Sequence, residues 1–71
     1  MYWWHLGDDM LLAIHEEMDR AKCTAEMFFI KAHLHVMGCQ RYVANDVVQF
    51  MQHGIVPEYV QVYLRYLQNR K

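Results

Sequence analysis

The sequence predicts an all-α protein of three to four helices, with a long N-terminal helix or helical hairpin followed by two shorter helices. Three observations lead to this fold class. Apolar residues recur at steps of three and four, no segment alternates as a β-strand would, and glycine or proline stands near the expected helix ends. The 71 residues are enough for one domain, 1–71, of which residues 1–7 form an aromatic arm without periodicity.

The first element is expected over residues 8–37, which contain neither glycine nor proline. Asp8 and Asp9 suit the positive end of a helix, and the spacing favours one continuous helix of up to about 45 Å. Thr24 is the only plausible break, because its hydroxyl can cap a second helix that starts at Ala25. Two helices therefore remain the alternative.

Apolar side chains of this element share one face, which we call the seam. The chain is 55% hydrophobic, yet a core of this size seldom supplies more than about 3–5 kcal/mol. We therefore expect the seam to join two copies in a homodimer. After Glu26 the apolar residues spread around most of the helix, so residues 27–37 should be enclosed on several sides. The seam consists of Leu11, Ile14, Met18, Ala21, Ala25 and Phe28.

Two shorter helices are expected after Gly38. The first runs from Gln40 to His53 and places polar residues, Asp46 among them, on its water side; Gly54 closes it. Pro57 suits the first turn of the last helix. The connections at 38–39 and 54–56 are short, so neighbouring helices should be antiparallel or sharply angled.

The charge pattern excludes several classes of partner. The net charge is −1 and the seven basic residues are dispersed, so no strong field attracts nucleic acid or an anionic membrane. No apolar stretch reaches the roughly 20 residues of a membrane helix, and the start does not resemble a secretory signal.

Cys23 and Cys39 are expected to be reduced packing residues of a cytoplasmic protein.

Catalysis, metal binding and a cofactor are not expected. The sequence has no serine, which excludes a serine triad, and Thr24 is the only threonine. His33 and His35 are two residues apart, so a helix turns them about 200° from one another and they do not share a metal. Cys39 and His35 share a face only if the helix continues through Gly38.

The function expected from these features is protein binding, with no identified family behind the prediction. Methionine and aromatic side chains form adaptable contact surfaces with large area. The surplus of such residues predicts a homodimeric modulator of another protein, as an inhibitor, adaptor or regulatory subunit, compatible with a bacterial or phage accessory protein. The expected partner-contact residues are Trp3, Trp4, Tyr59, Tyr63 and Tyr66.

A DNA-binding regulator is the alternative. The corner at Gly38 resembles a helix-turn-helix, in which the segment from Gln40 would enter the major groove. Gln40, Arg41 and further polar side chains could contact bases. Asp46 would oppose phosphates, and Leu34 stands where such motifs need a small residue. The alternative is therefore less favoured.

Overall fold

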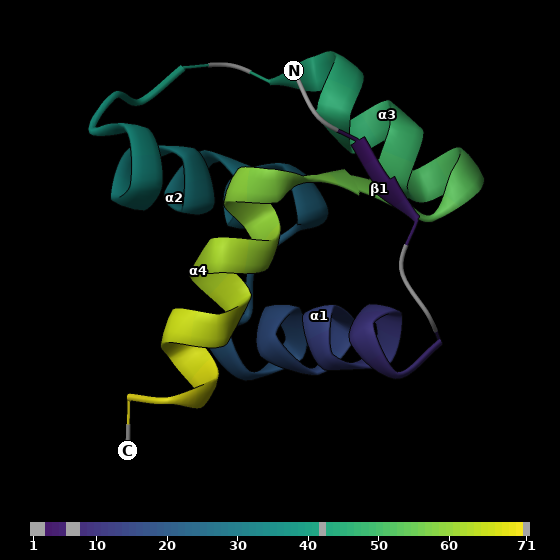
Figure 1. Cartoon of the computed structure of the whole chain (residues 1–71), viewed down its shortest axis with the longest axis horizontal. Helices are drawn as coiled ribbons and strands as arrows, with labels where there is room; N and C mark the ends of the chain where they lie inside the picture. Colours follow the sequence, from purple (N-terminus) through teal and green to yellow (C-terminus); the bar gives the residue numbers. More distant parts are fainter. Residues whose placement is uncertain (1–2, 6–7, 42, 71) are drawn as a thin grey trace.

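The computed structural model describes residues 3–5, 8–41 and 43–70, which form four helices and two short strands (Figure 1). Helices α1 (Asp8–Ala21) and α2 (Ala25–Met37) come first in the chain, and the shorter helices α3 (Ala44–His53) and α4 (Glu58–Gln68) follow. The predicted fold class, an all-α protein of three to four helices, is confirmed. Strands β1 (Trp3–His5) and β2 (Ile55–Pro57) add to it.

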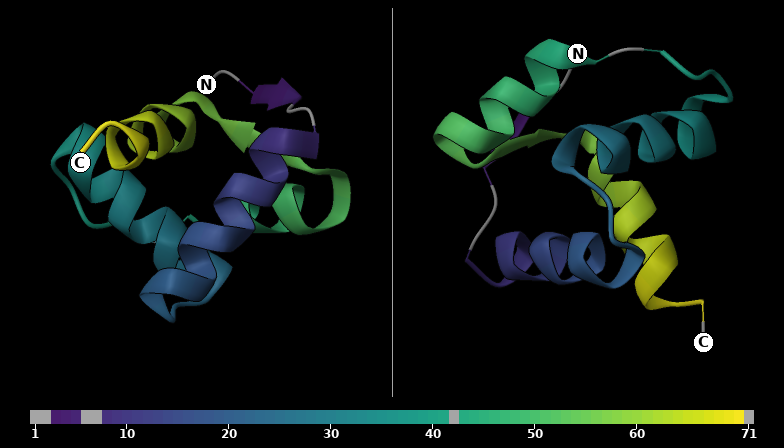
Figure 2. Two further views of the ribbon diagram at one scale, coloured as in Figure 1. Left: turned by 90° about the horizontal axis from the view of Figure 1, so that it is seen from below. Right: turned by 180° about the vertical axis from the view of Figure 1, so that it is seen from behind.

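The preference for one continuous helix over residues 8–37 is wrong, because the backbone turns between α1 and α2. Lys22 has a left-handed φ of 54°. The amide of Lys22 donates to the carbonyl of Asp19 at 3.1 Å, and the amide of Cys23 donates to that of Met18 at 3.0 Å. This pair of bonds is the Schellman arrangement that ends helices, although lysine replaces the usual glycine. The two helices diverge from the turn like the arms of a V (Figure 2, left).

Thr24 begins α2 as its N-cap. Its extended backbone leads into the helix, and its hydroxyl oxygen accepts a hydrogen bond from the amide of Met27 at 3.2 Å. One of the unpaired amides at the start of α2 is thereby satisfied. The alternative that the sequence left open, a break at Thr24, is the observed one.

The N-terminal arm contributes a strand that the sequence did not predict. β1 pairs antiparallel with β2, with Trp3 opposite Pro57 and His5 opposite Ile55. Three residues are too few to show a period, and their partner lies about fifty positions along the chain, so no local signal marks this strand. The structure describes the backbone of Trp3 and Trp4, while their side chains lie outside the described part.

The third helix begins later than predicted, at Ala44 instead of Gln40. Gly38 ends α2 in the left-handed conformation with φ 72°, as expected. The following carbonyl, that of Cys39, accepts a hydrogen bond from the His33 ring, which holds the chain outside a helix. The connection from α2 to α3 therefore spans residues 38–43 (Figure 1). Gly54 ends α3 as predicted, and Pro57 is the residue before α4 instead of a member of its first turn.

The core surrounds one face of α2, which packs most extensively against α4 and also against α3. Rings of Phe29 and Phe50 lie 5.5 Å apart between α2 and α3, and those of Phe28 and Tyr63 lie 5.5 Å apart between α2 and α4. The buried hydrophobic residues are Ile14, Phe28, Phe29, Ala32, Phe50, Val56, Tyr59, Val60 and Leu64.

The chain closes on itself about as well as an ordinary monomer. Its accessible surface is 4909 Å², close to the roughly 4,700 Å² expected for a folded monomer of its mass. The apolar surplus is therefore limited to single exposed side chains spread over the four helices. Among the residues whose side chains are described, the large ones are Leu12, Met27, Leu34, Met37, Val48, Met51, Val62 and Tyr66.

Removing the cap of α2 tests the observed break. We expect Thr24→Ala to lower the free energy of unfolding by about 1 kcal/mol, because the amide of Met27 loses its partner. Thr24→Ser keeps the hydroxyl and should retain most of the stability. Urea denaturation measures both variants, and equal stability of wild type and Thr24→Ala would contradict the capping role.

Candidate functional site

A buried polar pair joins α3 to α4. The hydroxyl of Tyr59 donates to Oδ2 of Asp46 at 2.6 Å, and both side chains are buried. Val43, the residue before α3, provides no side-chain cap, so the carboxylate of Asp46 is the negative group in the first turn of α3. A carboxylate at this position is stabilised by the positive end of the helix. The expectation that Asp46 faces water is therefore wrong.

The ring of His33, in α2, contacts the backbone of Cys39 after that helix and the ring of Tyr59. Its Nδ1 lies 2.7 Å from the carbonyl oxygen of Cys39. Because a carbonyl only accepts, Nδ1 is the donor in this hydrogen bond. The rings of His33 and Tyr59 meet edge to face, with centroids 5.1 Å apart at 83°. The ring orientation of His33 is thus fixed from two sides.

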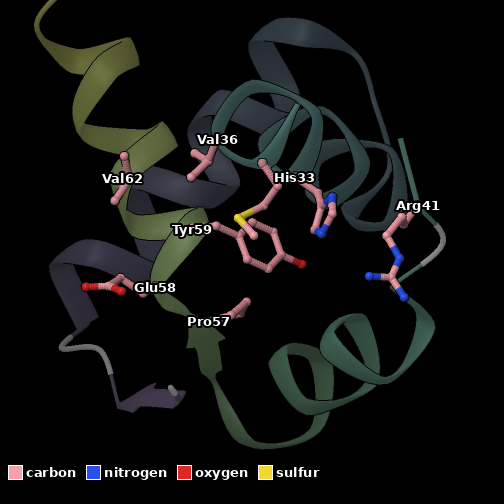
Figure 3. A pocket seen from close by; sticks show the side chains of 8 residues that line it. His33, Val36, Arg41, Pro57, Glu58, Tyr59 and Val62 are labelled. Carbon is pink, nitrogen blue, oxygen red and sulfur yellow. The ribbon is translucent and has the colours of Figure 1, made fainter. Parts of the chain in front are cut away.

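A pocket of about 330 Å³ opens beside these side chains, between the second half of α2 and the start of α4 (Figure 3). This volume is at the lower end of the range for small-ligand sites, about 300–1,000 Å³. Most of its wall is apolar. His33 and Tyr59 lie between the charged side chains of Arg41 and Glu58, which stand at opposite sides (Figure 3). The lining residues are His33, Val36, Met37, Arg41, Pro57, Glu58, Tyr59 and Val62.

Tyr59 is a neutral hydrogen-bond donor in this pocket. Burial raises its pKa well above the ordinary value of about 10, and the hydrogen bond to Asp46 and the negative charge of that carboxylate raise it further. The hydroxyl proton is held by Asp46 and stays in place at neutral pH. The arrangement suits binding through shape and fixed polar groups more than proton transfer.

The three predicted tyrosines do not form one exposed stripe. Tyr59 is buried, Tyr63 is half-buried, and Tyr66 is 42% exposed. The ring of His35 stacks against Tyr66 with centroids 4.2 Å apart, and it also lies 5.3 Å from Tyr63. A partner could reach Tyr59 only through the pocket, whereas Tyr66 is accessible directly. The other two predicted contacts, Trp3 and Trp4, have side chains outside the described part.

The six seam residues do not share one uninterrupted face, because the helix breaks between them. Ile14 and Phe28 lie in the chain's own core, whereas Ala21 is exposed. Self-association through the seam as a whole stays a prediction. Half-buried positions that pack against the core make up the rest of the set, namely Leu11, Met18 and Ala25.

Sequence reasoning missed the pocket and the interplay of His33, Asp46 and Tyr59. One signal was available for Asp46, since an acidic residue in the first turn of a helix without a capping side chain is placed favourably there. The side of α3 that meets α4 depends on tertiary packing. For His33 the sequence favours a satisfied or surface histidine over a metal ligand, but it identifies no hydrogen-bond partner.

The two cysteines lie in different environments. Both cysteines are free, but only Cys23 is half-buried against the core, and the packing role predicted for Cys39 is wrong because that residue is exposed. Among the described residues, no three His, Cys, Asp or Glu side chains are grouped as metal ligands would be.

The corner at Gly38 differs from a compact helix-turn-helix. Its connection spans residues 38–43, longer than the three or four residues of that motif. α3, which would enter the groove, contains neither lysine nor arginine. Its Asp46 is engaged by Tyr59. These three observations do not favour DNA binding.

Comparison with known proteins gives no further guide to function. No protein-family model matches the chain, and neither the search of curated proteins nor that of solved structures finds a match. In the described part of the chain, no helix has both the length and the apolar character needed to span a membrane. The geometry of the molecule therefore carries the functional argument.

The polar pair can be tested through the pH dependence of stability. Above about pH 10 an unfolded tyrosine ionises while Tyr59 in the folded chain keeps its proton, so the folded state binds more protons. The free energy of unfolding should fall as pH rises beyond this point, by up to about 1.4 kcal/mol per pH unit for this group. Tyr59→Phe should remove that part of the slope.

At pH 7 the free energy of unfolding of Tyr59→Phe should be about 1–3 kcal/mol lower than that of the wild type, because Asp46 stays buried without its donor. Tyr66→Phe is the matched control. Because Tyr66 is exposed, this substitution should change the free energy of unfolding by less than about 0.5 kcal/mol. Denaturant titrations from pH 7 to 11 measure all three chains. Parallel curves for wild type and Tyr59→Phe would refute the proposed role.

Proposed function

We propose that the protein is a binding module. It takes an apolar side chain of a partner protein into the pocket between α2 and α4, which we call the anchor pocket. It acts on that partner as an inhibitor, adaptor or regulatory subunit. The observation that carries this proposal is the continuity of the pocket with exposed apolar surface. Met37 is 62% exposed and Val62 39% exposed, and both line the pocket. Water around such side chains is released when a partner covers them.

The two charged side chains of the lining define the partner further. Arg41 stands at one side of the pocket and Glu58 at the other (Figure 3). A segment with an acidic residue on one flank of its apolar anchor and a basic residue on the other complements this arrangement. Charge complementarity of this kind sets orientation and specificity more than affinity.

The anchor pocket suits binding because its two buried polar side chains, those of His33 and Tyr59, are held in fixed positions. Asp46 holds the Tyr59 hydroxyl and the Cys39 carbonyl holds the His33 ring, so neither group must be ordered when a partner arrives. Met37 at the edge has a flexible side chain that adapts to different shapes. Fixed polar side chains beside an adaptable edge lower the entropy cost of binding.

Self-association is the second part of the proposal. Met27 and Leu34 on the outer face of α2 are exposed at helical spacing, and Ile30 between them is half-buried. A second copy covers this α2 stripe, defined by Met27, Ile30 and Leu34, in a symmetric contact that leaves the anchor pocket open. Free Cys23 and Cys39 are in keeping with a reducing compartment such as the cytoplasm.

A displayed library of random peptides tests the anchor pocket against many candidate anchors at once. We expect selected peptides to share an apolar anchor with an acidic residue on one flank and a basic residue on the other, and to shift the NMR signals of His33 and Tyr59. Val62→Asp should weaken their binding at least tenfold, because it places a charge in the pocket wall. Val48→Asp is the control on α3, where Val48 is also exposed but outside the pocket lining.

Two results would contradict the pocket proposal. One is equal loss of peptide binding in Val62→Asp and Val48→Asp. The other is a set of selected peptides that leaves the signals of His33 and Tyr59 unchanged.

Light scattering across a hundredfold dilution tests self-association. We expect the wild type to have the mass of a dimer at high concentration and Leu34→Glu to have the mass of a monomer, because the α2 stripe then carries a charge. Met51→Glu changes an exposed apolar residue of α3 and should leave the dimer intact. A monomeric wild type, or dissociation in both variants, would exclude the α2 stripe as the contact.

A further inference from the structure

A second pocket, which we call the basic pocket, lies at the opposite end of α4. Its volume is about 320 Å³. Three elements bring basic side chains to it: Arg20 from α1, Lys31 from α2 and Arg70 from the segment after α4. These residues are far apart in the sequence, where the basic residues look dispersed. The fold therefore gathers three of the seven basic residues around one hollow.

The lining has an excess of positive charge. Among the described residues of the lining, the only carboxylate is that of Glu17, which forms an ion pair with Arg20. Three cations against one anion leave a formal charge of +2 around the pocket, in a chain whose net charge is −1. An anion with about two negative charges balances this lining. A phosphate monoester carries about −1.5 to −2 at pH 7, whereas a carboxylate carries only one charge.

The shapes of the basic groups also suit phosphate. The planar guanidinium of Arg70 can donate two parallel hydrogen bonds to phosphate oxygens, and the ammonium of Lys31 supplies a mobile point charge. Ala21, the last residue of α1, also lines the pocket. The C-terminal end of a helix carries partial negative charge, which repels an anion. The side chains, and not a helix dipole, must therefore hold the anion.

The remaining wall is apolar and aromatic. Phe28, Tyr63 and Leu67 line it, with the rings of Phe28 and Tyr63 5.5 Å apart between centroids. Phe28 is only 2% exposed, so the half-buried ring of Tyr63 is the aromatic surface that a ligand can reach. The volume exceeds the space needed by a bare phosphate group, so the ligand should carry a body that packs on Tyr63 and Leu67. A flat aromatic or heterocyclic ring matches this wall, because such rings stack well on aromatic side chains. Burial raises the pKa of Tyr63, so its hydroxyl remains a neutral donor near the site.

We propose that the basic pocket binds a small phosphate monoester carried on an aromatic or heterocyclic ring. The site is separate from the anchor pocket, whose described lining residues it does not share. It adds a small-molecule ligand to a protein whose proposed function is protein binding. Failure of one proposal leaves the other standing, because the two pockets are probed by different ligands and variants.

Phenyl phosphate is the probe, added to the full chain at low salt and followed by NMR and calorimetry. We expect saturable binding that shifts the amide signals of Lys31, Tyr63 and Arg70 and weakens as salt increases. Arg70→Gln and Lys31→Gln should each reduce the affinity at least tenfold. Arg65→Gln is the matched control, because Arg65 is an exposed cation of α4 outside the lining, and it should bind as the wild type does. Circular dichroism checks that all variants stay folded.

Further ligands separate the parts of the proposal. Inorganic phosphate should bind at least tenfold more weakly than phenyl phosphate, and equal binding would overturn the role of the ring. Adenosine 5′-monophosphate and a phosphotyrosine peptide then distinguish the two sources of this chemistry. Tighter binding of the peptide would overturn the assignment to a small molecule. Absence of saturable binding, or equal loss in Arg65→Gln, would overturn the site itself.

Discussion

The turn between α1 and α2 is the constraint on which the rest of the structure depends. The amides of Lys22 and Cys23 bond to carbonyls in the last turn of α1, and the hydroxyl of Thr24 accepts a bond from one amide in the first turn of α2. Only after this turn can α1 lie against the other helices, where Ile14 enters the core and the ring of His15 lies 5.5 Å from that of Phe50. The turn also converts an extended apolar face into a closed core, which explains why the surface area of the single chain is ordinary.

The two ends of α4 have different characters. Its first turn borders the anchor pocket, where buried polar groups are paired with one another and the exposed wall is apolar. Its last turn borders the basic pocket, where cations from three elements converge. α2 contributes to both pockets, through His33 and Val36 at one end and Phe28 and Lys31 at the other. A small chain thus presents two chemically distinct concave surfaces on one pair of packed helices.

Sequence patterns predicted the features that depend on local chemistry. Gly38 and Gly54 mark helix ends because left-handed backbone favours glycine. The spacing of Phe28 indicates a buried position, but the sequence assigns it to a seam between two copies, whereas it lies in the chain's own core. Lys22 escaped prediction because lysine rarely adopts the left-handed conformation. The burial of Asp46 and the pairing of β1 with β2 depend on residues distant in the sequence, as do both pockets. Local spacing does not encode such contacts.

The most direct test of this account is a set of NMR distance measurements between α1 and the region around α3. A chain that folds back at Lys22 should show contacts between the ring protons of His15 and Phe50, whose centroids are 5.5 Å apart. It should also show contacts between the methyl groups of Leu11 and the α-protons of Gly54, where an added Cβ would lie 3.3 Å from Leu11 Cδ1. Continuous helical amide contacts through residues 19–27, without either long-range contact, would contradict the account and restore a single long helix.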